Sequence, residues 1–160
     1  MKGKPAVMAV LQAGITAEWS LALSYHMFTQ VMKRFGVKVY DGFDKLGEQC
    51  EDYAKELTRR LLFLEGDPVV NPADASTLDS VSAMLAKLQA DELSIVDQYA
   101  AATKACWDAG DMSNFHWFQH LSKWHREGDE GKQGHIAWIQ KMLWQIQTVG
   151  SEPEFIATQI

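Results

Sequence analysis

A thiol and a phenol, Cys50 and Tyr53, are the residues on which metal chemistry in this chain depends. They stand three apart in a stretch, about 44–65, whose pattern predicts one helix. The apolar stripe of this stretch has members seven apart: Phe43, Cys50, Leu57 and Leu64. Because residues three apart on a helix are neighbours, both side chains should lie on or beside the core-facing surface. Four-helix bundles present their metal ligands from such positions.

Single ionisable residues also interrupt three other rows that are mostly apolar. They are Glu18, Glu92 and His135, each in a row with members seven apart. The rows are Leu11, Glu18, Tyr25 and Met32; Leu78, Leu85, Glu92, Tyr99 and Cys106; and Leu121, Gly128, His135, Met142 and Val149. A buried carboxylate must be hydrogen-bonded, paired with a cation or bound to a metal. The pattern therefore indicates either a metal centre or a buried charge network.

The composition is that of a globular helical protein. The chain has 160 residues, of which 47% are hydrophobic, so we expect one domain over residues 1–160 with a full core. Its net charge of −6 argues against nucleic acid as the main partner. Two cysteines make no disulfide framework, so we expect a reducing cytoplasm. No apolar run approaches the about 20 residues that span a membrane, so we expect no membrane partner.

The periodicity predicts an all-α fold of four long helices and a short terminal one. The long helices are expected at 5–35, about 44–65, about 78–108 and from about 112 to 149, and the short fifth helix at 153–159. Residues 66–77, with two prolines and several small polar residues, form the longest irregular segment. A long crossover at this point would make the second and third helices parallel.

Five passages along the chain carry a family likeness: Glu18 with Tyr25 and Gly36; Leu62-Phe63-Leu64-Glu65-Gly66; Met84-Leu85 with Glu92; Gly134-His135-Ile136-x-Trp138; and Ile146-Gln147-x-x-Gly150 with Ala157-x-Gln159-Ile160. They cover nearly the whole chain, which resembles bacterioferritin, the haem-containing branch of the ferritins. The resemblance implies a ferritin-like four-helix bundle that assembles into a hollow 24-mer storing ferric mineral. It also implies Fe(II) oxidation at a di-iron site inside each bundle, and haem bound through a methionine at a two-fold interface.

The resemblance places the di-iron ligands one position at a time. The family uses one Glu from each of two helices and a Glu-x-x-His pair from each of the other two. Here Glu18 and Glu92 match the single glutamates, and His135 matches the histidine of the second pair. The other three positions are substituted, and they carry Cys50, Tyr53 and Lys132.

The segment between Glu92 and His135 is about seven residues longer than the family pattern. We predict that the excess divides into one extra helical turn on each side of the Gly110 turn, which preserves both core registers. A gapless count would instead bring Gly128 to the histidine position. Three glycines, at 128, 131 and 134, each weaken a helix by roughly 1 kcal/mol relative to alanine. A loop within the last long helix is therefore left open.

Two interpretations of the centre follow from the substitutions. In the first, which we favour, the ammonium of Lys132 neutralises Glu18 and Glu92, and the centre is inactive. In the second, Glu18, Glu92 and His135 bind one metal ion, and Cys50 makes the site softer and more zinc-like. Iron therefore remains a candidate ligand, but we do not expect an intact di-iron centre.

The resemblance also bears on redox chemistry and haem. Tyr25 is the candidate catalytic residue, as a redox tyrosine beside a ferroxidase centre. The family's haem methionine corresponds to Glu51, and the predicted second helix contains no methionine, so haem binding is not expected. The inner-surface iron ligands of the family correspond to Lys45 and Gln49, which are poor ligands for iron.

The sequence thus predicts a cytoplasmic iron-storage subunit of the bacterioferritin type whose ferroxidase activity is weak or absent. The expected partners are copies of the same chain, as a 24-mer cage or as a mixed cage with a catalytic sister subunit. Two alternatives are left open. One is a non-catalytic structural or interaction protein that kept the bundle, and the other is an enzyme with a remodelled single-metal site.

Overall fold

Five helices and one small hairpin make up the described part of the chain. The structure, a computed structural model, describes residues 2–34, 40–75, 80–129 and 132–149. In chain order the elements are α1 (Pro5–Arg34), α2 (Tyr40–Phe63), α3 (Val81–Asp108), α4 (Met112–Arg126), β1 (Gly128–Asp129), β2 (Lys132–Gln133) and α5 (His135–Val149). The predicted short helix at 153–159 lies outside the described residues.

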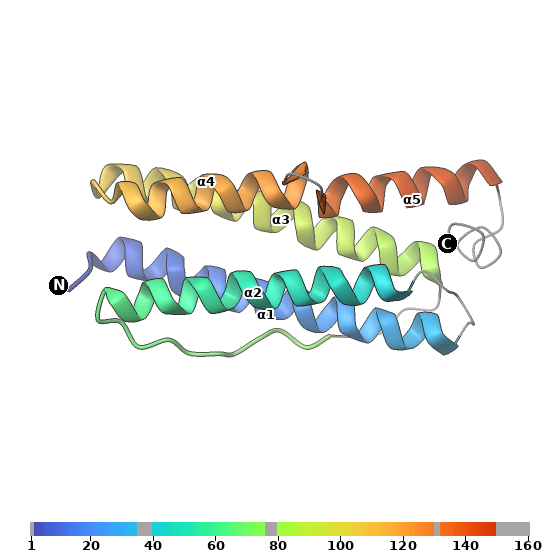
Figure 1. Ribbon diagram of the computed structural model, residues 1–160, viewed down its shortest axis with the longest axis horizontal. Coiled ribbons are helices and arrows are strands. Elements are labelled where there is room, and N and C mark those ends of the chain that lie inside the picture. The colour runs from blue at the N-terminus through green and yellow to red at the C-terminus, as the bar shows by residue number, and fades with distance from the viewer. Residues whose placement is uncertain (1, 35–39, 76–79, 130–131, 150–160) are drawn as a thin grey trace.

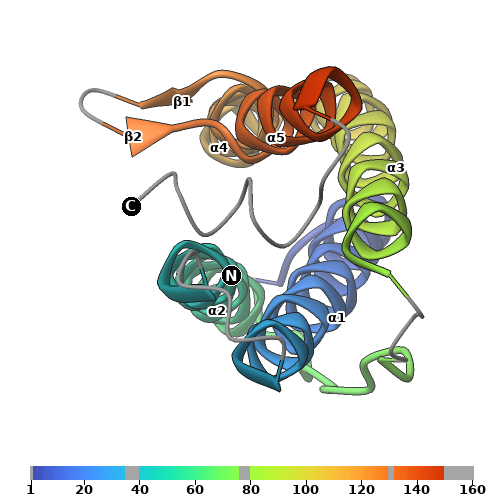
Figure 2. The ribbon, with the colours of Figure 1, turned by 90° about the vertical axis from the view of Figure 1, so that its right-hand side faces the viewer.

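The helices form a bundle with one long crossover, as predicted. Helices α1 and α2 make one antiparallel pair, and α3 lies against α4 and α5, which follow one another end to end (Figures 1 and 2). The segment after α2 runs back along the length of the bundle, so α2 and α3 point the same way (Figure 1). It is tied to α1, because Gln12 exchanges two hydrogen bonds with the backbone of Val69 and Ser20 accepts one from Ala73.

Local sequence explains where the helices begin and end. Pro5 opens α1, where its missing N–H has no partner to lose, and Lys33 and Arg34 close it where the helix dipole favours cations. Ser80 caps α3 by accepting a hydrogen bond from the Ala83 amide, and Asp111 caps α4 in the same way. The α3–α4 turn uses Gly110, whose φ of +73° is readily adopted only by glycine.

The fourth helix of the bundle is interrupted, which corrects the prediction of one helix from 112 to 149. Helix α4 ends at Arg126, a hairpin follows, and α5 begins at His135. The antiparallel strands pair Gly128 with Gln133 and Asp129 with Lys132, and the hairpin projects sideways from the bundle (Figure 2). The prediction of an extra helical turn on each side of Gly110 is therefore wrong. The extra residues lie in the hairpin.

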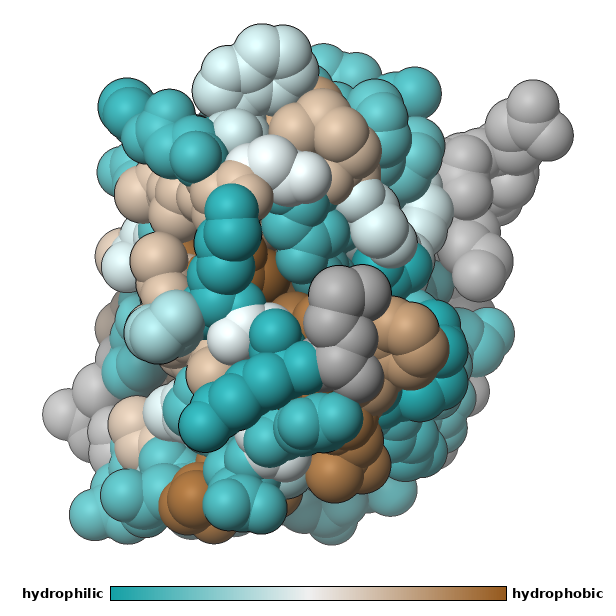
Figure 3. All heavy atoms as spheres, turned by 90° about the vertical axis from the view of Figure 1, so that its left-hand side faces the viewer, coloured by the Kyte–Doolittle hydropathy of each residue, from teal (hydrophilic) through white to brown (hydrophobic). Residues whose placement is uncertain are grey.

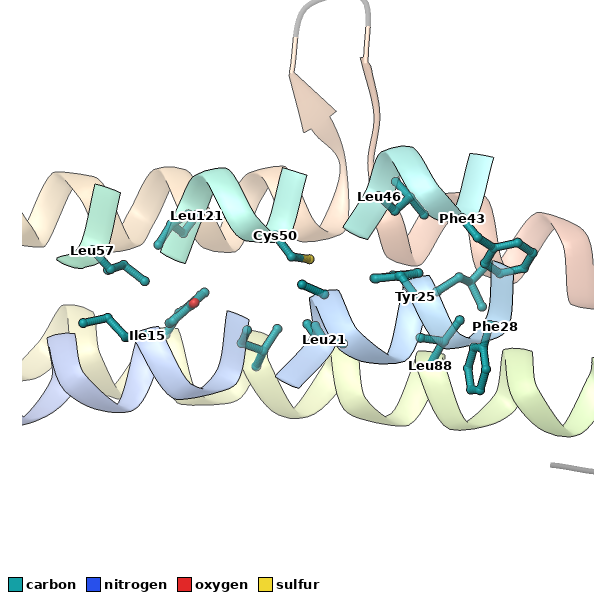
Figure 4. Close-up of a cluster of buried hydrophobic side chains, with 14 of the residues drawn as sticks. Ile15, Leu21, Tyr25, Phe28, Phe43, Leu46, Cys50, Leu57, Leu88 and Leu121 are labelled. Carbon is teal, nitrogen blue, oxygen red and sulfur yellow. The ribbon is translucent and has the colours of Figure 1, made fainter. Parts of the chain in front are cut away.

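The core consists of the rows predicted from the seven-residue spacing. Cys50, Leu57, Leu85 and Leu121 are all fully buried, and Glu18, Glu92 and His135 are buried among them. In Figure 4, Cys50 on α2 and Tyr25 on α1 both point into the interior of the bundle. The ionisable residues of the sequence pattern thus lie within a core to which all five helices contribute apolar side chains.

A separate hollow lies at the end of the bundle where α2 finishes and α3 turns into α4. Its volume is about 690 Å3, and Figure 3 shows apolar atoms at its bottom among hydrophilic groups. None of the buried ionisable residues lines it. One described helix, α1, is long and apolar enough to span a membrane by length and composition, but its Glu18 faces the bundle core.

Candidate functional site

Two reciprocal tyrosine–carboxylate pairs join α1 to α3 in the centre of the bundle. The Tyr25 hydroxyl on α1 donates to Glu92 Oε1 over 2.5 Å, and the Tyr99 hydroxyl on α3 donates to Glu18 Oε1 over 2.6 Å. In each helix the tyrosine follows the glutamate by seven residues, and the two helices run in opposite directions (Figure 1). Each tyrosine therefore reaches the carboxylate of the other helix.

His125 bridges the two carboxylates. Its Nε2 lies 2.7 Å from Glu18 Oε1 and its Nδ1 lies 2.6 Å from Glu92 Oε2. All three side chains are fully buried. An ionised carboxylate can only accept hydrogen bonds, so the imidazole donates from both nitrogens and carries a positive charge. His125 was not among the site residues predicted from the sequence.

The electrostatics of the triad are mutually consistent. Burial alone would lower the pKa of His125, but Glu18 and Glu92 outweigh it and raise that pKa well above its ordinary value. Burial alone would raise the pKa of Glu92, but His125 and His135 lower it well below its ordinary range. The pKa values of Tyr25 and Tyr99 are raised, first by burial and then by the carboxylates, so both phenols remain protonated donors.

His135 adds a second imidazole on the other oxygen of Glu92. Its Nδ1 lies 2.7 Å from Glu92 Oε1, and its Nε2 lies 2.9 Å from Gln49 Oε1 on α2. The rings of His125 and His135 meet edge to face with their centroids 4.8 Å apart. The centre thus contains a histidine pair rather than the glutamate and histidine expected from the family pattern.

The two substituted positions on α2 lie beside this histidine pair. Cys50 is fully buried, and its thiol sulfur, a Glu92 oxygen and a His135 nitrogen all lie within 4.8 Å of one another. Burial, then Glu18 and Glu92, raise the pKa of Cys50 well above its ordinary value. Tyr53 is partly buried and stacks on Trp124, with its ring edge-on to His125.

The hairpin explains how two histidines from different helices meet. Gly128 opens it with a φ of +86°, and at Gly134 an added Cβ would lie only 2.5 Å from the carbonyl oxygen of Arg126. The neck of the hairpin can therefore close only because position 134 has no side chain. His125 and His135 flank this neck and are held about as close as residues one helical turn apart.

An alignment to the family pattern without a gap, the alternative given above, is the signal that could have identified His125. That alignment brings Gly128 to the family's histidine position, so the residue three earlier, at the glutamate position, is His125. Both alignments are partly met in the structure. His125 stands at the family's glutamate position, as in the gapless alignment, and His135 reaches the family's histidine position across the hairpin. The glycines at 128 and 134 marked the interruption in the sequence.

The predicted role of Lys132 requires correction. It was expected on the same helix as His135, one turn earlier, but it lies on β2 and its backbone pairs with Asp129 in the projecting hairpin. The physical requirement behind the prediction still holds, since buried carboxylates need a compensating cation. Here His125 meets it.

The residues present do not fit a di-iron pair. Such a centre needs carboxylates that bridge two ions, and both bridging positions carry other groups, with His125 at one and Cys50 at the other. The two remaining carboxylates are already engaged: Glu92 lies within hydrogen-bonding distance of Tyr25, His125 and His135, and Glu18 accepts two hydrogen bonds. Two further cations beside a protonated His125 would be repelled by it.

Glu51, at the position expected for a haem methionine, instead contacts a histidine of α1. Glu51 Oε1 lies 2.9 Å from His26 Nε2, and Asp44 Oδ1 lies 2.7 Å from the Nδ1 of the same ring. Burial opposes it, but these hydrogen bonds raise the pKa of His26. Helix α2 contains no methionine, so it offers no thioether for axial ligation.

Comparison with known proteins shows the family to which the chain belongs. The family model described as the ferritin-like domain matches residues 8–149. The fold is similar to that of bacterioferritin BfrA of Mycobacterium tuberculosis, with a TM-score of 0.89, 18% identity, and coverage of 99% of this chain and 96% of that one.

A second bacterioferritin, from Rhodobacter capsulatus, is described as having a metal-free dinuclear site and a haem iron. It gives a TM-score of 0.87 and 22% identity, with 99% of this chain and 94% of that one covered. The search of curated proteins found no match. Because the family model spans most of the chain, the protein belongs to the ferritin family, and its fold is that of the bacterioferritins.

Proposed function

We propose that this protein is a shell subunit of a cytoplasmic ferritin-type cage that stores iron, and that its own bundle does not oxidise iron at a di-iron centre. The storage role comes from the family to which the chain belongs. The loss of di-iron chemistry is inferred from the residues that form the centre. In this proposal residues 1–160 act as one ferritin-like domain, and haem is not bound at position 51.

The bridge from Glu18 through His125 to Glu92 is the observation that supports the proposal best. It supplies both carboxylates with a positive charge at hydrogen-bonding distance, which is the need that iron meets in an active centre. A fully buried charge network of this kind holds together only when each member is satisfied. The bundle can therefore be stable without metal.

The iron would then have to be oxidised elsewhere. Tyr25, the candidate redox residue, donates a hydrogen bond from its hydroxyl group to Glu92, and its raised pKa keeps the phenol protonated. In this proposal it therefore serves as a structural hydrogen-bond donor. Gln49, at a position where the family binds iron on its inner surface, has its side chain turned to His135. A mixed cage, in which a sister subunit supplies the oxidising centre, accounts for both features.

The test combines particle size with iron oxidation. Purified protein should sediment as a large assembly, and air oxidation of two Fe(II) per chain should show no fast phase whose amplitude follows the chain concentration. Co-assembly with an active bacterioferritin subunit should restore the fast phase in proportion to that subunit. A monomer or simple dimer would remove the storage proposal. A fast phase from this chain alone would contradict the inactive centre.

A further inference from the structure

Next to His125, the centre has the composition of a site for one soft divalent ion. We propose that Cys50, Glu92 and His135 bind a single zinc ion, with Glu18 Oε2 as the fourth ligand. This inference concerns the same centre as the proposed function but does not depend on cage assembly or iron storage. It requires only the folded bundle.

Three of the four ligand atoms are already gathered. Cys50 Sγ, an oxygen of Glu92 and a ring nitrogen of His135 lie within 4.8 Å of one another, and all three side chains are buried. Zinc binds thiolate sulfur at about 2.3 Å and imidazole nitrogen or carboxylate oxygen at about 2.0–2.2 Å, so tetrahedral ligand atoms lie about 3.3–3.6 Å apart. The side chains would close on the ion by up to about 1.5 Å.

An unsatisfied oxygen points to the same ion. Glu18 is fully buried, and its Oε1 is bound by His125 and Tyr99. Its Oε2 receives no hydrogen bond from a nitrogen or oxygen among the described residues, and the Cys50 thiol is only a weak donor to Glu18. A carboxylate oxygen that has at most a thiol donor in a closed core is costly, because a weak hydrogen bond compensates little of the lost hydration. A cation between Cys50 and Glu18 would supply a stronger partner.

The hydrogen bonds of His135 also leave room for a cation. Its Nε2 faces Gln49 Oε1, an acceptor, so the ring proton belongs on that nitrogen. Its Nδ1 then presents a lone pair toward Glu92 Oε1, 2.7 Å away, which is unfavourable unless a second proton or a cation lies between them. Gln49 thus fixes the tautomer that a metal-binding histidine needs, as partners of ligating histidines commonly do.

The charges balance when one zinc ion is present. The Cys50 S–H bond breaks, an S–Zn bond forms, and the proton leaves to solvent. The centre then holds three negative charges, on Cys50, Glu18 and Glu92, against two on zinc and one on protonated His125. A second divalent ion would leave the core with two uncompensated positive charges, so the stoichiometry is one. His125 remains in place and supports the two carboxylates.

Cobalt(II), which substitutes for zinc and is coloured, tests the site directly. The full-length protein is stripped with a chelator and titrated with Co(II), and the spectrum is followed. We expect one Co(II) per chain, a thiolate-to-cobalt charge-transfer band in the near ultraviolet, and displacement of cobalt by zinc. X-ray absorption of the zinc form should show one sulfur neighbour at about 2.3 Å.

The two cysteines provide a matched pair of variants, because both are buried and unpaired. Cys106→Ser should keep the charge-transfer band, and Cys50→Ser should lose it. Gln49→Ala, which leaves the ligands intact, should weaken cobalt binding by about 10- to 100-fold. The X-ray absorption measurement needs no variant, so it decides the question even where Cys50→Ser fails to fold.

Three results would overturn the zinc site. They are the absence of a sulfur neighbour in the zinc form, a charge-transfer band that survives in Cys50→Ser, and two cobalt ions per chain. Failure to bind cobalt would leave the cage and iron-storage proposal unaffected, since that proposal is tested by particle size and iron oxidation. Loss of the large assembly would likewise leave the zinc titration interpretable.

Discussion

His125 donates from Nε2 to Glu18 Oε1 over 2.7 Å, and neither side chain has any exposed surface. The opposite nitrogen of the ring makes a similar bond to Glu92, so one imidazolium joins the two carboxylates that the ferritin fold places at its centre. Such a bridge makes the charge of His125 a condition for the stability of the whole core.

Replacement of His125 should destabilise the protein strongly. His125→Gln can donate to only one carboxylate and carries no charge, which leaves a buried charge uncompensated. Removing one partner from a buried ion pair costs about 3–5 kcal/mol, and we expect a loss of that size in the free energy of unfolding measured with urea. Lys132→Ala is the matched test of the alternative cation and should change the unfolding free energy little. A larger effect for Lys132→Ala than for His125→Gln would contradict this assignment.

A second change should recover part of that loss. Because Glu18→Gln removes one of the charges that His125 compensates, the double variant Glu18→Gln/His125→Gln should be more stable than the sum of the single effects predicts. Contacting residues in one network typically couple by about 0.5–3 kcal/mol. A double-mutant cycle by urea unfolding measures this coupling. Strictly additive effects would mean that the two side chains do not interact in the folded protein.

The stability of the wild-type protein should fall as the pH rises above the ordinary histidine value of 6.5. Since the folded-state pKa of His125 is raised, its contribution is fully present below 6.5 and is lost as the pH rises toward the folded pKa. Between these limits the loss is about 1.4 kcal/mol per pH unit for one proton. His26, whose pKa is also raised, adds a change of the same sign.

The comparison of wild type with His125→Gln isolates the contribution of His125, because His26 is present in both. The difference in unfolding free energy between them should shrink from pH 6.5 to pH 8. At the acid end the lowered pKa of Glu92 acts in the opposite sense: its contribution is present above the ordinary value of 4.5 and is lost only well below it. A difference that stays constant from pH 6.5 to pH 8 would show that His125 is neutral in the fold.

Removal of the hairpin should join α4 and α5 into one helix. Deleting residues 128–134 places His135 three positions after His125, the spacing at which helix neighbours meet. Both rings should then keep their contacts with Glu92, and the helix content seen by circular dichroism should be retained, with a cooperative melting transition. Deletion of residues 129–134 is the matched control, because it puts the two histidines four apart and rotates α5 by about 100°. Equal stability of the two deletions would contradict the role given to the hairpin.

The helical frame was predictable because every long helix has an apolar row with a seven-residue spacing. Glu18, Glu92, Cys50 and His135 were expected on core faces for that reason, and all four are buried. The reciprocal tyrosine pairs were predictable in principle as well. Glu18 and Tyr25 repeat the spacing of Glu92 and Tyr99, and the crossover fixes α1 and α3 as antiparallel.

The bridge by His125 was harder to predict, because it depends on where an insertion lies. Helical spacing places His125 and His135 on different faces of an uninterrupted helix, so no periodic argument brings them together. Their contact depends on a close backbone approach at Gly134 and a left-handed residue at Gly128, which sequence periodicity does not encode. Because a continuous helix was assumed, Lys132 was predicted to supply the compensating charge.

Crystals soaked anaerobically in Fe(II), with diffraction data recorded at the iron absorption edge, test the central claim most directly. We expect no iron between Glu18 and Glu92, where the ring of His125 keeps its bonds to both carboxylates. A pair of iron peaks between these carboxylates, with His125 displaced from them, would contradict it.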